Sequence, residues 1–437
     1  MKNKADFILG EFPPVSARQW KDKIHFDLKG EDYNSLITKT LEGIDIKPFY
    51  HSDTYRSLDF TLEPKDFLAV EKLSSVPDKE TLAGIFRRDA DRVHVKIKKR
   101  EDLSLLPQIH KEMIYADMDF LPDGSTEFQD PVPLFNPLNR LVRTGNWYVN
   151  EKSDMDATAL FLEKYPEGKI EIDAGIFREA GANIVQEIAY ALAEMSSLIE
   201  RFGTGSINRI RFKTAIGYHY FFEIAKFKAW RYLFQLITDN DGNRVTIFAE
   251  PLLRNKTLLD PYVNMLRAGM EVTAAALGGA DEIAGLPYDF VYNPANEEAR
   301  RLATNQLLLL REEAGFRGVN RFVEGTYYIE EIAFRLAEKA LDLWKQIEKG
   351  GGFLKQLYKG NIQRKIDENA RKEQALFDEG KLILTGTNKF RNPAEKLPEI
   401  RRLLRLRKKT RKTLIRPVVA KRLSEKVESA FLKSVSS

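Results

Sequence analysis

The central part of the chain alternates short apolar segments with amphipathic helical patterns, and this alternation restricts the fold more than any other feature. The apolar segments are mostly aliphatic or β-branched and are bounded by polar or turn residues, which is typical of strands. The expected strands cover residues 93–97, 113–118, 169–173, 209–214, 245–249 and 282–286. Alternating strands and helices predict an α/β fold with a parallel sheet.

Two of the intervening helical patterns are especially regular. One apolar stripe runs along Ile184, Ile188, Ala191, Leu192, Met195 and Ile199, and a second along Ile329, Ile332, Leu336, Ala340, Leu343 and Ile347. Spacings of three and four residues place each set on one face of a helix. Repeated strand–helix units favour a TIM-type (β/α)8 barrel. A doubly wound open sheet is the second choice, because no Gly-x-Gly-x-x-Gly fingerprint follows an expected strand.

The segments on either side of the expected barrel differ from it in pattern. Residues 1–55 contain Pro13, Pro14 and Pro48, and proline pushes the residue before it toward extended backbone, so we expect an extended N-terminal arm. The degenerate barrel is assigned to residues 56–350. Residues 351–437 are expected to form a helical C-terminal extension with a basic tail, and a further strand is expected over 381–385.

Composition excludes several classes of site. The chain has no cysteine, which excludes disulfides, thiolate metal sites and cysteine nucleophiles. The five histidines are spread singly, so no histidine-built metal site is expected; they are His25, His51, His94, His110 and His219. No apolar run reaches the roughly 18 residues of a membrane span, and the first residues lack the apolar core of a signal peptide. We therefore expect a cytoplasmic protein.

The stretch from Arg401 to Arg422 contains eleven Lys or Arg residues and no acidic residue, while the rest of the chain is mildly acidic. Such a tail could contact nucleic acid or a membrane surface. It lacks the aromatic residues and the known motifs of nucleic-acid modules, and it carries Leu403, Leu404, Leu406 and Leu414. We favour a solvated or subunit-bound helix, with neither nucleic acid nor a membrane as partner.

Polar residues follow several expected strands, at the end where a barrel places its active site. They lie in Asp173-Ala174-Gly175, Gly217-Tyr218-His219-Tyr220, Glu250-Pro251 and Leu286-Pro287-Tyr288-Asp289. His219 is interpreted as a structural histidine. The carboxylate pairs Asp117/Asp119 and Glu312/Glu313 could support acid–base chemistry, but alternating or adjacent carboxylates are more often solvated.

Several blocks of the sequence resemble methylmalonyl-CoA mutases, and they keep the family's order from the arm to the last part of the chain. The blocks are residues 39–50, Glu179-Ala180-Gly181-Ala182-Asn183, residues 221–229, residues 260–267 with Gly278-Gly279-Ala280-Asp281, residues 324–330, and Gly386-Thr387-Asn388-Lys389-Phe390. The resemblance implies a barrel that acyl-CoA threads and a C-terminal cobalamin domain that caps it. Catalytic subunits of the family interconvert methylmalonyl-CoA and succinyl-CoA by radical chemistry from adenosylcobalamin.

Three departures from the family pattern indicate that the catalytic site is lost. No counterpart of the cobalamin domain, with its Asp-x-His-x-x-Gly motif, is found after Phe390. The Tyr-His pair that precedes Glu-Ala-Gly in catalytic members falls on Gly175 and Ile176, and neither side chain can donate a hydrogen bond. Pro251-Leu252-Leu253-Arg254 replaces a Thr-Ser-Gly-Trp tract. We expect Ile176 and Phe177 to help fill the barrel interior with apolar groups.

These features predict the small, non-catalytic subunit of a heterodimeric, adenosylcobalamin-dependent methylmalonyl-CoA mutase, which stabilises its large catalytic partner through a large interface. The resemblance implies that this chain has no catalytic, cofactor-binding or metal-binding residues, and that the large subunit binds adenosylcobalamin. The alternative is an acyl-CoA isomerase barrel that acts with a separate cobalamin-binding chain. Such enzymes keep the substrate residues that Gly175 and Ile176 replace.

Overall fold

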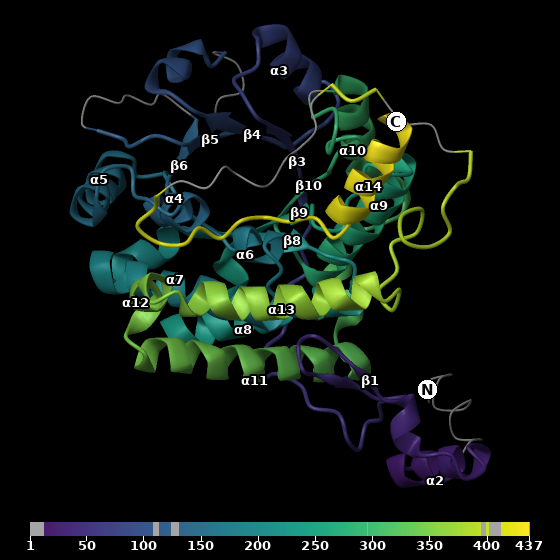
Figure 1. Ribbon diagram of the computed structural model, residues 1–437. Helices are drawn as coiled ribbons and strands as arrows, with labels where there is room; N and C mark the ends of the chain where they lie inside the picture. Colours follow the sequence, from purple (N-terminus) through teal and green to yellow (C-terminus); the bar gives the residue numbers. More distant parts are fainter. Residues whose placement is uncertain are drawn as a thin grey trace, which may run out of the picture.

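Eight parallel strands form one sheet in the computed structural model, which describes residues 13–107, 113–123, 131–294, 296–394, 399–401 and 412–436 (Figure 1). The strands are β3 (Leu68–Leu73), β4 (Arg92–Ile97), β5 (Ile114–Met118), β6 (Val132–Leu134), β7 (Ile170–Asp173), β8 (Ile210–Ile216), β9 (Thr246–Pro251) and β10 (Glu282–Ala284). Each strand after β3 follows its neighbour in chain order, and β10 returns to pair with β3. A parallel bridge between Leu134 and Lys169 joins β6 to β7 and closes the barrel. The predicted (β/α)8 barrel is confirmed.

Helices follow the strands and cover the outside of the barrel (Figure 1). They are α3 (Lys79–Phe86), α4 (Pro137–Thr144), α5 (Glu151–Lys164), α6 (Gly175–Glu179), α7 (Ile184–Phe202), α8 (Tyr220–Thr238), α9 (Pro261–Gly278) and α10 (Glu297–Leu308). The two predicted apolar stripes lie on α7 and on α11 (Tyr327–Lys349), and α11 packs against both α7 and α8. The main core lies between these helices and the sheet, where Phe212 of β8 meets Trp230 of α8.

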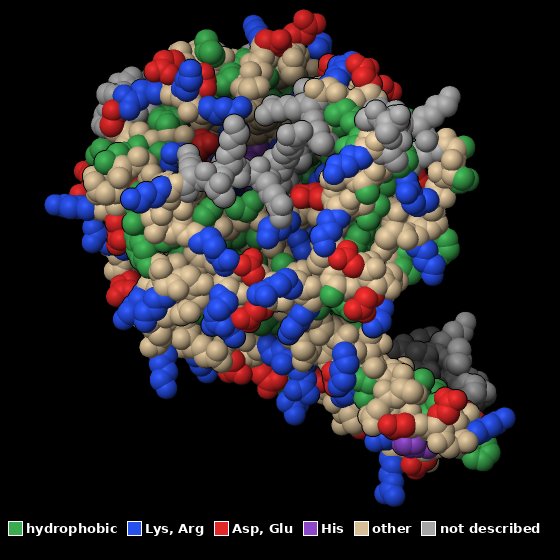
Figure 2. All heavy atoms as spheres, in the orientation of Figure 1, with side chains coloured by type: hydrophobic (Ala, Val, Ile, Leu, Met, Phe, Trp, Pro, Cys, Tyr) green, Lys and Arg blue, Asp and Glu red, His purple; other side chains and the backbone are tan. Residues whose placement is uncertain are grey.

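The N-terminal arm contains a helix, which differs from the extended backbone expected for residues 1–55. The helix α2 (Ala17–Asp27) begins after Ser16, whose side chain and that of Gln19 cap each other's backbone N–H groups. Proline restricts the residue before it and does not prevent a helix that starts three residues later. A short hairpin, β1 (Thr38–Lys39) with β2 (Asp45–Ile46), follows. No residue of α2 is buried, and α2 stands away from the barrel in Figures 1 and 2, whereas Ile44, in the turn of the hairpin, packs into the main core.

The C-terminal part begins with α12 (Gly352–Tyr358) and α13 (Asn361–Asp378), which pack onto the main core. The prediction of a strand over residues 381–385 is wrong, because only a single bridge between Thr385 and Lys389 forms there. Residues 402–411 of the basic tail lie outside the described residues. The segment 412–424, here called the C-terminal strap, has no helical structure, and α14 (Glu425–Ser436) follows it.

The C-terminal strap runs across the side of the barrel at which the strands end (Figure 1). Its backbone N–H groups donate hydrogen bonds to carbonyls of α4, α6 and the loop after β9; the pairs are Ile415–Gly145, Val418–Val142, Lys421–Glu179 and Leu423–Arg254. Gly145 has a φ of +80°, and a Cβ there would lie 2.4 Å from the Ile415 carbonyl oxygen. Glycine therefore allows the strap to approach α4. None of the described helices is both long and apolar enough to cross a membrane.

Candidate functional site

Charged side chains occupy the inward positions of the barrel strands. Successive side chains of a strand point to opposite faces, so residues two apart share a face. On β7 the inward pair is Glu171 and Asp173, and on β8 it is Arg211 and Lys213. The expectation of an apolar interior is therefore wrong. Phe177 instead points outward, where its ring meets those of Tyr190 and Phe353.

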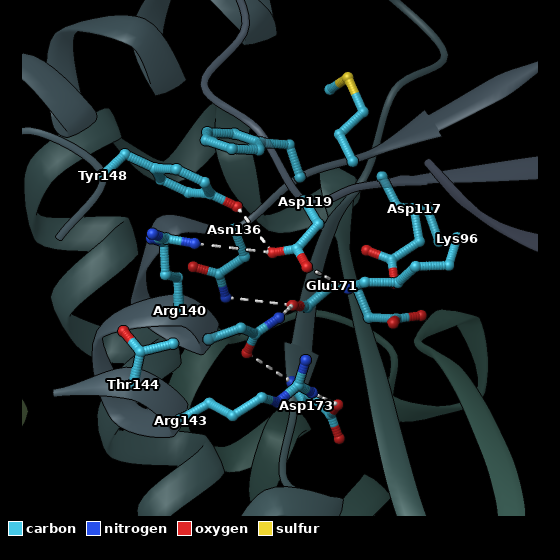
Figure 3. A pocket seen from close by; sticks show the side chains of 14 residues that line it. Lys96, Asp117, Asp119, Asn136, Arg140, Arg143, Thr144, Tyr148, Glu171 and Asp173 are labelled. Carbon is cyan, nitrogen blue, oxygen red and sulfur yellow. Dashed lines mark hydrogen bonds and ion pairs between the residues drawn. The ribbon is translucent and has the colours of Figure 1, made fainter. Parts of the chain in front are cut away.

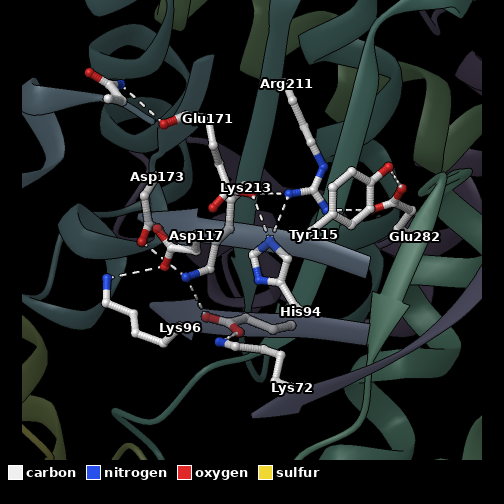
Figure 4. Close-up of polar contacts among 12 residues, drawn as sticks. Lys72, His94, Lys96, Tyr115, Asp117, Glu171, Asp173, Arg211, Lys213 and Glu282 are labelled. Atoms are coloured by element: carbon white, nitrogen blue, oxygen red, sulfur yellow. Dashed lines mark hydrogen bonds and ion pairs between the residues drawn. The ribbon is translucent and has the colours of Figure 1, made fainter. Parts of the chain in front are cut away.

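The deeper layer of charges is centred on Arg211, which is 1% exposed (Figure 4). Its guanidinium forms ion pairs with Glu171 and Glu282 and lies 4.6 Å from the centroids of the Tyr115 and Phe248 rings. The Tyr115 hydroxyl donates a 2.8 Å hydrogen bond to Glu282. These contacts connect β5, β7, β8, β9 and β10 across the barrel axis and close it.

His94 also lies in the deeper layer, with its Nε2 3.4 Å from the Arg211 guanidinium. Burial, followed by the charges of Arg211 and the neighbouring lysines, lowers the pKa of His94 well below its usual value. The imidazole is therefore neutral at physiological pH. The ring packs against those of Tyr115 and Phe248, and His94 also lines the larger of the two cavities described below.

The upper layer lies at the mouth of the barrel, where carboxylates and cations alternate (Figure 4). The Lys213 Nζ is 2.9 Å from an Asp173 oxygen and 3.0 Å from a Glu250 oxygen, and Lys72 also pairs with Glu250. Arg143 donates a 2.7 Å hydrogen bond to Asp173. Burial alone would raise the pKa of Glu250, but Lys213 and Lys72 outweigh it and lower the pKa to about 2.

Two cavities open at this layer. The larger has a volume of about 540 Å³ and lies toward β3, β10 and α10; the smaller, about 260 Å³, lies toward α4 (Figure 3). Both are lined by Lys96, Asp117 and Arg143. In the smaller cavity, Asp119 accepts a 3.4 Å hydrogen bond from Tyr148. Sequence reasoning set the Asp117/Asp119 pair aside as solvated, yet both carboxylates line a cavity and pair with Lys96.

The structure brings together some of the polar residues expected at the mouth and separates others. Asp173 lines the smaller cavity, and Glu250, Pro251, Leu286 and Pro287 line the larger.

Tyr218 instead donates a hydrogen bond to Glu373 of α13, and the His219 ring packs 4.1 Å from that of Phe222. Asp289 accepts hydrogen bonds from Asn293 and Asn296. Glu312 pairs with Arg311 and Arg317 on the surface.

Gly175 and Ile176 form the first turn of α6, directly after β7. A Cβ at Gly175 would lie 3.1 Å from a carboxylate oxygen of Asp173, so the ion-paired Asp173 takes the space next to this position. Ile176 is 8% exposed and belongs to the main core. Neither residue lines the two mouth cavities.

The chemistry of the mouth favours binding over proton transfer. A general acid or base works best when its pKa lies near the working pH. The ion pairs move Glu250 to a low pKa and raise the pKa of Lys213 well above its usual value, despite its burial. In the described part of the chain, no cluster of three His, Asp or Glu side chains could hold a metal ion.

Burial raises the pKa of Glu179 in α6 to about 7, and a second buried acid, Glu194 of α7, should also change protonation near the physiological range. Burial raises its pKa to about 8, and its Oε1 accepts a 2.7 Å hydrogen bond from Asn136. A raised carboxyl pKa favours the protonated folded state, so this contribution to stability is complete below the unfolded pKa of 4.5 and is lost as the pH rises through about 8.

Glu194→Gln keeps the acceptor for Asn136 but cannot ionise. We expect the variant to gain about 1–3 kcal/mol of unfolding free energy over the natural chain between about pH 5 and about pH 8. Urea unfolding at a series of pH values measures this difference. Glu200→Gln, on the exposed side of the same helix, is the control and should show no pH-dependent gain. If the unfolding free energy changed with pH in the same way in all three proteins, the raised pKa of Glu194 would be contradicted.

Comparison with known proteins indicates the family to which this chain is related. A family model described as methylmalonyl-CoA mutase matches residues 136–436. The methylmalonyl-CoA mutase small subunit of Porphyromonas gingivalis is 28% identical, with 90% of this chain and 73% of the relative covered. The small subunit of Propionibacterium freudenreichii subsp. shermanii is 30% identical, with 88% and 70% covered. The large subunit of the same organism is 31% identical, but only 51% of this chain and 32% of that subunit are covered.

Proposed function

Because the chain belongs to the methylmalonyl-CoA mutase family, we propose that it is the small, non-catalytic subunit of a heterodimeric, adenosylcobalamin-dependent methylmalonyl-CoA mutase. Its role is to stabilise the large subunit, which carries out the isomerisation and binds the cofactor. The observation that carries this proposal is the closed, ion-paired barrel axis. The names of the two small-subunit relatives, which match most of the chain, support it.

The deeper charged layer closes the path that a substrate would take along the barrel axis. The resemblance to the family implies that acyl-CoA threads the barrel of a catalytic subunit. Here Arg211 joins Glu171 and Glu282 across that path. Opening the path would leave buried charges unpaired, which costs several kcal/mol. The folded chain therefore favours the closed axis strongly.

The mouth side is also partly covered. The C-terminal strap crosses it, and Arg422 at its end is held by Glu428 with two 2.6 Å hydrogen bonds. Arg254, in the tract that replaces Thr-Ser-Gly-Trp, pairs with Glu373 and donates a hydrogen bond to the Lys421 carbonyl. The tract that replaces Thr-Ser-Gly-Trp thus holds the strap in this chain.

The described histidines do not fit a cobalt-ligating role. His25 and His51 belong to the arm, His94 lies against the Arg211 guanidinium, and His219 packs against Phe222. His110 lies outside the described residues. No step of the reaction is therefore assigned to this chain, and adenosylcobalamin is assigned to the large subunit.

Co-expression with the large subunit tests the proposal. We expect a stable 1:1 complex by size-exclusion chromatography, with succinyl-CoA isomerisation when adenosylcobalamin is added, and no activity from this chain alone. Turnover by this chain alone would contradict the proposal. Turnover with only a separate cobalamin-binding chain would favour an acyl-CoA isomerase barrel instead.

A further inference from the structure

The larger mouth cavity has no role in the proposed function. It lies above the ion-paired floor of the barrel and is bounded by the loop after β10 and by α10. Its volume of about 540 Å³ is in the usual range for small-ligand sites. The cavity is therefore large enough for an organic molecule even though the axis below it is closed.

Positive charge is in excess around this cavity. Of the side chains that line it, six are basic and three are acidic. Asp119 and Asp173 do not line the cavity but pair with two of these cations, Lys96 and Lys213. Even when these two carboxylates are counted, the described cations outnumber the carboxylates. An anionic ligand would therefore be attracted, and a cationic one repelled.

Arg300 of α10 is a part-buried cation in the cavity wall that is only loosely paired. Its one ion pair among the described residues is with Glu71, at 3.7 Å, which is longer than a hydrogen bond. The Nε of Arg300 and the Oε1 of Glu71 are buried and have no hydrogen-bond partner in the described part of the chain. Arg88 lies equally far from Glu71, so two guanidinium groups share one carboxylate loosely.

A guanidinium group binds a carboxylate in a planar, two-bonded arrangement, and the Arg300 side chain, which lines the cavity and is 17% exposed, can offer such a contact. Other walls of the same cavity are apolar. Leu286, Pro287 and Phe290 come from the loop after β10, and Leu73 comes from the end of β3. The cavity thus offers a cation for an acid group and an apolar surface for a short hydrocarbon chain.

We propose that this cavity binds a small organic acid as the free carboxylate, held by Arg300, with its hydrocarbon part against Phe290 and Leu286. The free acid is specified because the closed floor leaves no room for a long carrier group along the barrel axis. The inference is independent of whether the chain is catalytic, because the site lies above the ion-paired floor.

Binding of simple probes to the full chain, alone or in its complex, tests the inference. We expect pentanoate to bind saturably in isothermal titration calorimetry. Pentylamine tests the sign of the charge and should not bind. Inorganic phosphate tests for a phosphate-bearing ligand and should bind at least about tenfold more weakly than pentanoate. Binding of the amine, or tighter binding of phosphate, would overturn the assignment.

Two variants locate the site. Arg300→Gln should weaken pentanoate binding about tenfold or more, whereas Arg301→Gln, its exposed neighbour on α10, should leave it unchanged. Phe290→Ala should weaken pentanoate about fivefold and acetate much less, because acetate lacks the hydrocarbon chain. Thermal unfolding checks that each variant is folded. Unchanged affinity in both Arg300→Gln and Phe290→Ala would overturn the inference, and an intact heterodimer in that case would leave the proposed function standing.

Discussion

Replacing Arg211 with methionine is expected to lower the free energy of unfolding by about 3–5 kcal/mol. The guanidinium is buried between Glu171 and Glu282, so its removal leaves two carboxylates in the barrel axis without a cation. The variant also loses the contacts of the guanidinium with the Tyr115 and Phe248 rings. Urea unfolding followed by circular dichroism measures the change.

Two further variants separate charge from packing in this experiment. The triple variant Glu171→Gln, Arg211→Met, Glu282→Gln removes all three charges and is expected to recover most of the lost stability, because a buried ion pair is worth little more than well-packed neutral groups. Arg244→Met changes an arginine that is 87% exposed and should have almost no effect. A single Arg211→Met variant as stable as the natural chain would contradict the ion-paired axis.

Alanine in place of Trp20 or Phe26 is expected to weaken binding to the large mutase subunit by about 30-fold or more for each substitution. Trp20 is 49% exposed and Phe26 76% exposed, although both are large and apolar, and α2 buries none of its residues within the chain. An arm of this kind needs a partner to cover it. Surface plasmon resonance with immobilised large subunit measures the affinity.

The same two substitutions should leave the free energy of unfolding of the lone chain nearly unchanged, since neither side chain is buried in it. Leu105→Ala, which shortens a 65% exposed leucine in the turn after β4, is the matched control. The arm would not be the partner contact if both arm variants bound as tightly as the natural chain. Equal losses in the Leu105→Ala control would indicate a non-specific effect.

The sequence predicted the barrel because most of its strands are aliphatic runs of the expected length. β3 was missed because Glu71 and Lys72 interrupt its apolar run, and β6 because it has three residues, one of them Pro133. The closure of the barrel between Leu134 and Lys169 rests on a single bridge, which no local pattern can reveal.

A signal for the charged axis was present in the sequence. Glu171 and Asp173, like Arg211 and Lys213, are charged residues two apart in strands that are otherwise apolar. Both faces of such a strand are covered, so charged residues at every second position lie on one face, and here that face points into the barrel. Which carboxylate meets which cation could not be predicted, because the partners lie on different strands and their meeting depends on the barrel's register.

The helix of the arm also had a local signal. Ser16 and Gln19 have the spacing of a capping box, but the preceding prolines favoured an extended reading. The course of the C-terminal strap had no such signal. It depends on backbone hydrogen bonds to α4, α6 and the β9 loop, in which side-chain identity matters little apart from Gly145.

The most direct test of the central claim is to count the acyl-CoA molecules bound to the purified heterodimer. Equilibrium dialysis with radiolabelled succinyl-CoA, in the absence of adenosylcobalamin, gives the number of sites per complex. The closed axis predicts one site per heterodimer, in the large subunit, and none on this chain alone. Two equivalent sites per heterodimer would contradict the account, because the second would have to pass through the layer of Arg211, Glu171 and Glu282.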